Sequence, residues 1–456
     1  MTDYFKFSKY LLYILPLGMV IVTSSTLFPF IVGKYAWFRG LVDIALILFL
    51  IGLFLTKNNF YKDRLLKVLK SPLTISVLVF TAIFVLAGFF GINPKMSFWS
   101  NFERGEGGIQ IIHLAIFFLL LGILFVEEKE WQNFLIFSLI GGVLMAFYGF
   151  FAAIGVSGFI GPQYGEEFRL SGSIGNPAYT AAYSIFMMFF AAYIIVARYS
   201  RRLLSAGSLA LFGLIIFFLA VFFLAATRGA FIGLVAAIVV FLGYFAYSKK
   251  EIRKRLFAGI AVVLVVAGAM VYFKDTDAVK SIPGARIFDI SFSAQTFQHR
   301  TIMWKMAWEG FKERPLLGWG PENYIQIFDR HFDIRYFEPA KGFGAWFDRA
   351  HSIYFDYLAE TGILGLLSYL SIFGIFYWQF FKFSKKPIIN NKQQAIKGKN
   401  QLLAIGEKSS IANALFFALP VAYLIQGIVL FDVFTIYFNV FTFLALANFK
   451  FNLGDN

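Results

Sequence analysis

Apolar runs of about 20 residues recur along this chain and constrain its fold more than any other feature. A helix of about that length crosses the hydrocarbon core of a bilayer. Only helices and closed barrels satisfy their own backbone hydrogen bonds in lipid, and the runs are too long and uniform for barrel strands. Hydrophobic residues make up 59% of the chain, against about 45–50% in an average soluble domain. The sequence therefore predicts an all-α integral membrane protein.

We expect twelve transmembrane helices. The first run is too long for the core of a signal peptide, so we interpret it as an uncleaved span. The chain contains no cysteine, which excludes disulfides and thiolate metal sites. The twelve spans lie at about 8–32, 38–56, 73–92, 107–126, 131–153, 178–198, 203–224, 228–247, 256–273, 352–382, 409–430 and 432–450.

Basic residues alternate between the loops on the two sides of this arrangement. One set of loops, with the termini, carries 24 lysines and arginines. The opposite short loops carry only Lys34, Arg39, Lys95, Arg104, Arg169 and Arg228. Because cytoplasmic loops are enriched in Lys and Arg, both termini are expected in the cytoplasm. The net charge of +15 is then explained by orientation and not by a nucleic-acid partner.

One large segment, 274–351, is expected outside the cell, before the tenth helix. Apolar residues at helical spacing over 298–311 predict an amphipathic helix lying on the membrane or over the bundle. Pro321-Glu322 favours the start of another short helix, so the segment is predicted to form a helical cap. The stretch 383–408 is rich in Lys, Asn and Gln and predicts a cytoplasmic linker. With no internal repeat found, residues 1–456 are interpreted as a single polytopic domain.

Arg228 is the only charged residue between Leu203 and Ser248 and falls between two apolar runs. An interfacial arginine that extends to lipid headgroups would explain it. Charges within membrane segments are nevertheless functional more often than not, so we treat Arg228 as a candidate site residue.

Three further candidates are ambiguous when taken alone. Arg169 precedes a glycine-rich turn that ends in Asn176-Pro177, and free N–H groups at a helix start favour an anion. The same pattern also suits an ordinary helix start. Arg300 opens the amphipathic helix, where a lone arginine is usually solvated. His351 lies where the external segment re-enters the membrane, and an interfacial histidine would explain it equally well.

The order of these motifs resembles the O-antigen ligase and polymerase superfamily. The spacing of about seventy residues from Arg228 to Arg300, and about fifty more to His351, is similar to the ligase pattern. Two positions depart from the commoner forms, because Ala178 and Ser352 stand where asparagine often occurs. The resemblance covers about 160–370 and rests on Gly-Asn-Pro at 175–177, Thr-Arg-Gly at 227–229, Arg300 with Trp304, Pro-Leu-Leu-Gly-Trp-Gly at 315–320, Ala-His-Ser at 350–352 and Glu-Thr-Gly-Ile-Leu-Gly at 360–365.

The resemblance implies a membrane glycosyltransferase with its active site on the outer face of the cytoplasmic membrane, towards the periplasm or exterior. The donor would be a glycan on undecaprenyl pyrophosphate, and the transfer would be inverting and need no metal or other cofactor. The acceptor would be a hydroxyl of a glycan, lipid or protein. Ligation is the first expectation. Repeat-unit polymerisation and protein O-glycosylation by an oligosaccharyltransferase remain open.

The residues suit these roles chemically. Arg228 and Arg300 are expected to bind the pyrophosphate and stabilise the charge on the leaving group. His351 is expected to act as general base, and nearby positive charge favours the neutral imidazole that accepts a proton. The expected substrate-binding residues are Arg169, Asn176, Trp304, Tyr354 and Glu360.

Two other classes of protein compete with this interpretation. A metal-dependent transferase would need carboxylates, but Asp275-Thr276-Asp277 follows a helix end and is expected to be a solvated loop. A lipid-linked oligosaccharide flippase would more naturally show repeat symmetry and charges midway along several helices. Asp43 is the main such charge, and we expect it to pair with Arg39 one turn earlier.

The topology can be tested with single cysteines, because the native chain has none. In intact cells an impermeant thiol reagent should label cysteine at Gln295 and leave cysteine at Gln393 unmodified. Labelling of position 393 alone would reverse the orientation and remove the basis for an external active site.

Overall fold

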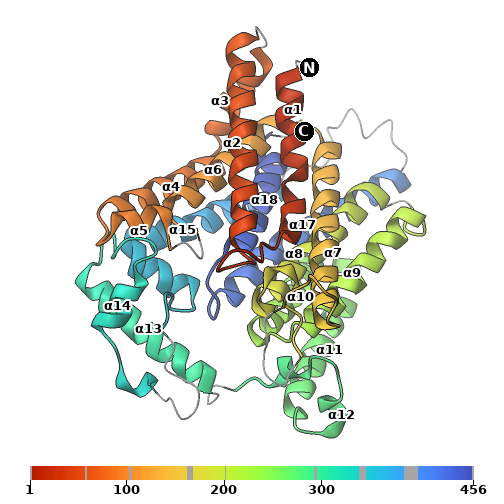
Figure 1. The fold of residues 1–456 in the computed structure, drawn as a ribbon. Helices are drawn as coiled ribbons and strands as arrows, with labels where there is room; N and C mark the ends of the chain where they lie inside the picture. Colours follow the sequence, from red (N-terminus) through yellow and green to blue (C-terminus); the bar gives the residue numbers. More distant parts are fainter. Residues whose placement is uncertain are drawn as a thin grey trace. The chain divides into compact units, whose positions relative to one another are not determined.

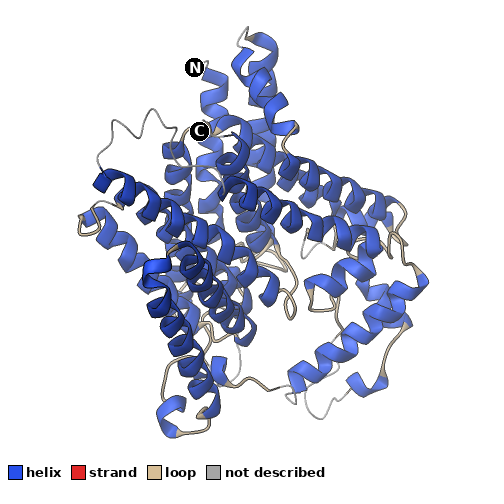
Figure 2. Cartoon of the chain, turned by 180° about the vertical axis from the view of Figure 1, so that it is seen from behind, coloured by secondary structure: helices blue, strands red, loops and turns tan. Residues whose placement is uncertain are grey.

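The protein consists of helices and connecting loops in a computed structural model (Figures 1 and 2). Within the described ranges there is no β-strand, which confirms the all-α expectation. The structure describes residues 3–56, 59–101, 105–161, 168–200, 202–291, 295–337, 346–384 and 399–453, with side chains from 410 onward in the last range.

Nine helices in this part of the chain are long and apolar enough to cross a membrane. Two shorter apolar helices, α6 (Gly108–Leu124) and the 410–426 part of α17 (Lys399–Gln426), lie at two more expected positions. The total of twelve spans stays a prediction. The nine are α2 (Val32–Leu55), α4 (Pro72–Phe89), α7 (Glu128–Ala153), α8 with η3 (Pro177–Tyr199), α9 (Ala206–Leu224), α10 (Arg228–Ser248), η4 with α11 (Lys250–Tyr272), α15 (Ile353–Ser384) and α18 with η8 (Phe434–Leu453).

The expectation of one continuous helix over 8–32 is wrong. An α-helix, α1 (Asp3–Ile14), is followed by a 3-10 helix, η1 (Leu15–Val20), and residues 21–31 are not helical. Pro16 lies at the start of η1, where its missing N–H and its ring are incompatible with a continuing α-helix.

Contacts divide the chain into two compact units, which we describe separately. The first unit comprises Met1–Phe134, Ile290–Phe376 and Gly427–Asn456. In it α1 packs on α2, and α6 packs on α4 and α18. Every residue of α18 from Phe434 to Asn448 is buried, and its Phe438 ring stacks on Phe117 with centroids 5.1 Å apart. Aromatic packing of this kind holds helices together where lipid removes the usual hydrophobic driving force.

Basic residues gather at one end of the first unit. Lys9 pairs with Glu130, and Arg64 of the amphipathic helix α3 (Asn59–Leu69) donates to the carbonyl of Leu453 at 2.6 Å. Both chain termini lie at this end (Figure 1). Helix α6 ends at Leu124 near these basic residues, since Arg64 donates to the carbonyl of Gly122. Its start at Gly108 lies at the opposite end of the unit. This grouping agrees with the expected alternation of basic loops, and the cytoplasmic assignment stays a prediction.

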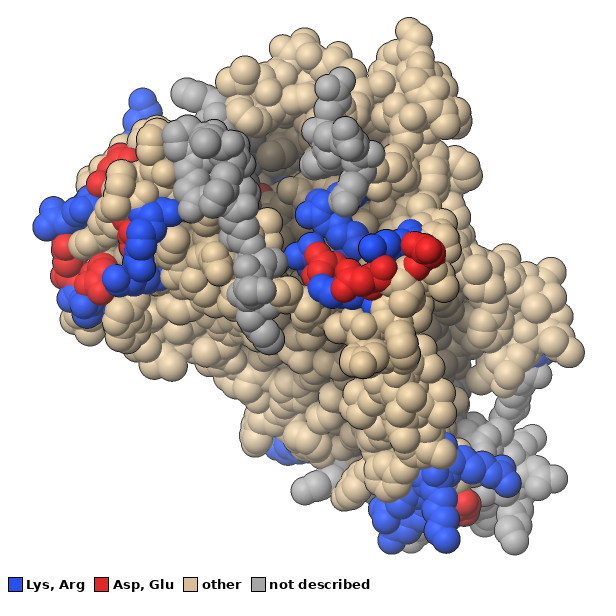
Figure 3. Space-filling model, turned by 90° about the horizontal axis from the view of Figure 1, so that it is seen from below, with Lys and Arg blue, Asp and Glu red and all other residues tan. Residues whose placement is uncertain are grey.

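The second unit comprises Leu135–Asp289 and Tyr377–Gln426. In it α8 packs on α9, and α10 packs on α11 and α17. The close approach of α10 to α17 depends on Gly233, where a Cβ would lie 2.7 Å from the carbonyl oxygen of Ala422. On the face seen in Figure 3, charged side chains gather in separate patches and other residues cover the rest.

The expected external segment contains α12 (Asp277–Lys280), η5 (Ala285–Phe288), α13 (Gln295–Glu313), α14 (Tyr324–Arg330) and η6 (Ile334–Tyr336). The helix expected over 298–311 is confirmed as α13. Its apolar side packs on protein, because Met303, Met306 and Ala307 share a buried cluster with Tyr324 and Ile327 of α14.

The next helix begins later than expected. The sequence predicts its start at Pro321-Glu322, but α14 begins at Tyr324. Glu322 has a φ of +67°, which a right-handed helix cannot contain. Residues 292–294 and 338–345 of the segment, and 385–398 of the linker expected over 383–408, lie outside the described residues.

Candidate functional site

The candidate residues belong to two groups, one in each unit. Arg169, Asn176 and Arg228 lie in the second unit, and Arg300, Trp304, His351, Tyr354 and Glu360 lie in the first.

In the second unit, Arg228 is the first residue of α10 and is held by a carboxylate. Its Nη2 lies 2.6 Å from Oδ2 of Asp289, and Nζ of Lys274 lies 2.6 Å from Oδ1 of the same side chain. The hydrogen bond from Lys274, followed by the charge of Arg228, lowers the pKa of Asp289, so this carboxyl is ionised at neutral pH. Arg228 and Lys274 thus share one carboxylate, that of Asp289.

Arg169 lies beside the loop that leads into α10. Its Nη2 donates to the carbonyl oxygens of Ala225 and Ala226 at 3.3 and 3.4 Å and to Oγ1 of Thr227 at 3.3 Å. The loop also contains a strained residue, because Ala226 has a φ of +49°. Two motifs that are 58 positions apart in the sequence are thus adjacent in the fold.

The expected turn before α8 is confirmed. Gly175 is in the left-handed region, and the side-chain oxygen of Asn176 accepts a hydrogen bond from the N–H of Ala178 at 2.9 Å. Pro177 occupies the first turn, where its missing N–H costs nothing. Asn176 therefore caps the helix, and a role in substrate binding remains a prediction.

In the first unit, two of the sequence motifs form one structural element. The segment 315–320 inserts at a break in α15, where Gly362 has a φ of +66°. Trp319 and Gly320 donate their N–H groups to the carbonyls of Ala359 and Glu360 at 3.0 and 2.8 Å. A Cβ on Gly318 would lie 2.4 Å from the carbonyl carbon of Glu360, so only glycine permits this contact.

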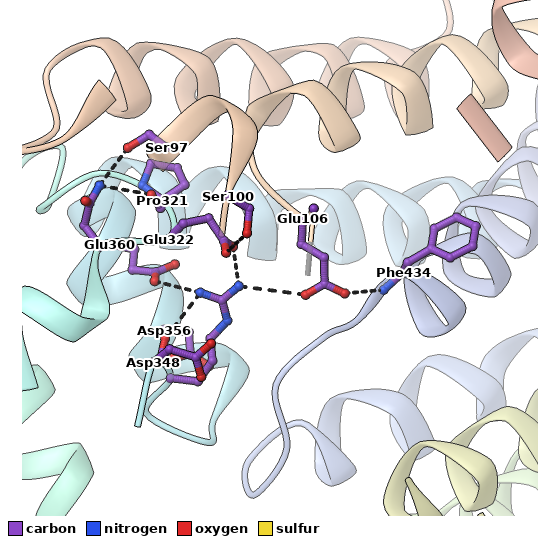
Figure 4. A network of polar contacts seen from close by, with 12 residues as sticks. Ser97, Ser100, Glu106, Pro321, Glu322, Asp348, Asp356, Glu360 and Phe434 are labelled. Atoms are coloured by element: carbon purple, nitrogen blue, oxygen red, sulfur yellow. Dashed lines mark hydrogen bonds and ion pairs between the residues drawn. The ribbon is translucent and has the colours of Figure 1, made fainter. Parts of the chain in front are cut away.

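A buried guanidinium lies next to this element. Arg349 contacts Glu322 through Nη2, Oε1 of Glu360 through Nη1 at 3.1 Å, and Oε2 of Glu106 at 3.8 Å. We call these four residues the Arg349 cluster. The three glutamates come from separate segments and converge on one point (Figure 4). Burial acts to lower the pKa of Arg349, but the carboxylates of Glu322 and Glu360 outweigh it and hold that pKa well above its ordinary value.

Two carboxylates of the Arg349 cluster accept further hydrogen bonds. Oγ of Ser100 donates to Oε2 of Glu322 at 2.5 Å, and the N–H of Phe434 donates to Oε1 of Glu106 at 2.7 Å (Figure 4). One oxygen of Glu322 and one oxygen of Glu106 thus have a fixed hydrogen-bond donor. The cluster joins the loop before α6, the segment 315–323 and the starts of α15 and α18 into one rigid junction.

His351 follows Arg349 by two residues in the sequence. Its Nδ1 lies 3.2 Å from the carbonyl oxygen of Arg349, and its ring packs edge-on against Phe347 and Phe431 with centroids 4.8 and 5.1 Å away. A carbonyl only accepts hydrogen bonds, so Nδ1 carries the proton in this contact. In a neutral ring that is protonated at Nδ1, the lone pair is on Nε2. The arrangement suits a general base acting through Nε2.

Backbone strain is concentrated around the candidate residues. Among the described residues, positive φ outside glycine occurs only at Ser100, Ala226, Glu322 and His351. Glu322 belongs to the Arg349 cluster, Ser100 donates to it, and His351 follows Arg349 by two residues. Ala226 contacts Arg169. Such conformations cost about 1–3 kcal/mol each and persist where the surroundings impose them, often at active sites.

The remaining candidates lie on α13 and on the first two turns of α15. The Trp304 ring stacks on Phe355 with centroids 5.4 Å apart and an angle of 10°. Arg300 precedes Trp304 by one turn and so lies on the same side of α13. Tyr354 is half-buried beside Phe355 on α15, and Glu360 is buried in the Arg349 cluster. Arg300 thus lies on the side of α13 that meets the start of α15.

Sequence reasoning missed the partners of these residues. Arg349 was visible beside His351, but nothing in the sequence linked it to Glu106 or Glu322. Asp289 and Lys274 gave no signal because they resemble ordinary loop charges. The charge of Asp43 acts on Arg39 as expected, but the contact of its Oδ1 is with Nε2 of His113 at 3.1 Å, and Nε of Arg39 donates to Gln110.

No group of three or more His, Asp or Glu in the described part of the chain has the geometry of a metal site. Asp275 and Asp277 are exposed at the start of α12, as expected for a solvated loop.

We predict that Arg349→Ala lowers the free energy of unfolding by about 3–5 kcal/mol, because it leaves buried carboxylates without their counter-ion. Arg335→Ala is the matched control, since that guanidinium is 64% exposed and paired only with Asp333, and it should cost below about 1 kcal/mol. Thermal unfolding in detergent measures both. Equal effects would show that the Arg349 cluster does not hold the junction.

Comparison with known proteins gives one family match. Residues 212–370 match the family described as O-Antigen ligase. The match confirms the resemblance seen in the sequence and assigns this segment to the O-antigen ligase superfamily. The segment includes Arg228, Arg300 and His351. No curated protein gives a significant match to the chain.

Proposed function

We propose that this membrane protein with an O-antigen ligase segment transfers a glycan from undecaprenyl pyrophosphate to an acceptor hydroxyl. The reaction would take place on the outer face of the cytoplasmic membrane. The observation that carries the proposal is the contact of His351, whose Nδ1 lies 3.2 Å from the carbonyl oxygen of Arg349. A neutral ring that donates there accepts a proton at Nε2. This histidine and the two arginines lie in the matched segment in the order that the resemblance implies.

The proposed step is a single displacement. Nε2 of His351 takes the proton of the acceptor hydroxyl while its oxygen attacks the anomeric carbon. The bond from that carbon to the pyrophosphate oxygen breaks, and undecaprenyl pyrophosphate leaves with the electron pair. Attack from the side opposite the leaving group inverts the anomeric configuration. Arg228 and Arg300 stabilise the charge that grows on the pyrophosphate, and two guanidiniums make the transfer independent of a metal ion.

The geometry favours an enzyme over a flippase. A general base must be held in one orientation and tautomer, and the rigid Arg349 cluster beside His351 supplies that constraint. A transporter has no need of a strained histidine with a fixed acceptor nitrogen. Ligation, repeat-unit polymerisation and protein O-glycosylation share this step and differ only in the acceptor. Ligation is favoured because the family match carries that description.

We predict that His351→Ala lowers the rate of transfer about 10²–10⁴-fold, as expected for loss of a general base. Donor binding should be nearly unchanged, because the arginines provide it. Arg228→Lys should weaken donor binding and also slow turnover, since lysine keeps the charge and loses the planar fork. The measurement is transfer in vitro from a purified undecaprenyl-pyrophosphate glycan in the presence of chelator, with donor binding measured separately.

The matched control is His331→Ala, because that histidine lies on the cap and contacts Glu313. It should retain near-normal transfer. Near-normal transfer by His351→Ala would remove this histidine from the mechanism. Strict dependence on a divalent cation would instead favour carboxylate chemistry.

The proposed site requires Arg228 and His351 to come within reach of one donor. We expect cysteines at these two positions to be joined by a bifunctional thiol reagent spanning about 15 Å, roughly a pyrophosphate and one sugar between contacts of about 3 Å. The absence of native cysteine makes the result specific. Cysteines at His351 and Lys67 serve as control and should not be joined, because Lys67 lies on the basic helix α3. Failure of the first pair to react would separate the two groups and contradict a single site.

A further inference from the structure

Asp289 lies between two cations at the start of α10, and this arrangement resembles a bound phosphate. One carboxylate oxygen contacts Nη2 of Arg228 and the other contacts Nζ of Lys274, each at 2.6 Å. We propose that Asp289 occupies the phosphate site of the donor-free protein, and that Lys274 is a further phosphate-binding residue there. The proposal rests on the proposed role of Arg228 in binding the donor.

The positive charge around Asp289 exceeds the single negative charge of its carboxylate, so an anion with more charge can be accommodated. Three cations act on this carboxylate, namely Lys274, Arg228 and Arg286. Lys274 and Arg228 also repel each other, and a single negative charge offsets only part of this excess. Lys274 is influenced by a second carboxylate besides Asp289, that of Asp275. A pyrophosphate diester carries two negative charges and therefore balances the site better than one carboxylate does.

The hydrogen-bonding capacity of Arg228 is also incompletely used. Its Nε is buried and has no hydrogen-bond partner in the described part of the chain. A guanidinium prefers two parallel hydrogen bonds to a phosphate or carboxylate. Asp289 engages only Nη2. A phosphate that accepts from Nε and Nη2 together would complete the fork.

Asp289 can leave without unfolding the segment that carries it. The Asp289 side chain is 45% exposed, so an incoming anion can reach it. The preceding 3-10 helix η5 is anchored by other contacts. Ile287 is buried, and the ring of Phe288 packs edge-on against Phe231 of α10 with centroids 5.3 Å apart. Gly284, with a φ of +80°, lies directly against the carbonyl oxygen of Phe223.

The two cations Arg228 and Lys274 give the site a preference for pyrophosphate over monophosphate. Any anion that binds must first displace the carboxylate, which lowers its apparent affinity by the fraction of protein in the open state. A doubly charged ligand with more oxygens recovers this loss by engaging both cations. A lipid monophosphate has fewer oxygens to span Arg228 and Lys274. The two cations would therefore distinguish the donor from monophosphate lipids, while competition with Asp289 lowers the affinity for both by the same factor.

The test uses the purified full chain in detergent and isothermal titration with inorganic pyrophosphate and inorganic phosphate, both without divalent cations. Asp289→Asn should bind pyrophosphate about three- to tenfold more tightly, because the internal competitor is neutral. Lys274→Ala should bind pyrophosphate about tenfold more weakly, the usual effect of losing a charge-assisted hydrogen bond.

Matched controls remove the same charges from the neighbouring surface. Asp277→Asn and Lys280→Ala alter exposed residues of α12 and should leave both affinities within about twofold, since exposed charges at a distance are screened. Thermal unfolding of each variant shows whether it is folded. Asp289→Ser serves in place of Asp289→Asn if the latter fails to fold.

The outcomes separate this inference from the proposed function. If Arg228→Ala weakens pyrophosphate binding but Asp289→Asn and Lys274→Ala do not change it, the inference is wrong and the donor role of Arg228 stands. If Arg228→Ala has no effect, the proposed donor site itself is wrong. A less stable Asp289→Asn protein with unchanged affinity would make Asp289 a structural ion-pair partner only and overturn the inference.

Discussion

In the first unit, the arrangement of the backbone around the candidate site depends on one buried positive charge. Arg349 is fully enclosed, and a guanidinium in such surroundings must be compensated by carboxylates with good geometry. Glu322 and Glu360 supply that compensation, with Glu106 behind them. Because the three glutamates come from distant parts of the sequence, satisfying one charge fixes several segments at once. The strained conformation of His351 two residues later is possible because this junction holds its backbone.

The two arginine–carboxylate arrangements differ in a way that matches their proposed roles. The Arg349 cluster is buried, so opening it would expose uncompensated charge to a medium of low dielectric constant. The contact between Arg228 and Asp289 is partly exposed, and an ion pair of that kind contributes little net stability. The first arrangement suits a permanent support. The second suits a place where one anion replaces another.

Glycine and proline explain where the helices of the site depart from regular geometry. Gly362 allows α15 to break so that the segment 315–320 can pair with its backbone, and Pro16 ends α1 early. These residues were visible in the sequence. Their consequences were not, because a glycine in an apolar run is usually tolerated within a helix and membrane helices also accommodate proline by local adjustment.

The sequence by itself determined the all-helical membrane fold and the positions of most helices, because length and hydropathy decide what a bilayer accepts. It also made Arg228, Arg300 and His351 candidate site residues through motif order. Only the tertiary structure decided what these residues contact. Glu106 meets Arg349, and Asp289 meets Arg228, across separations of 243 and 61 positions. Charge pairing between residues so far apart in the sequence depends on how the helices pack. Local periodicity in the sequence does not predict that packing.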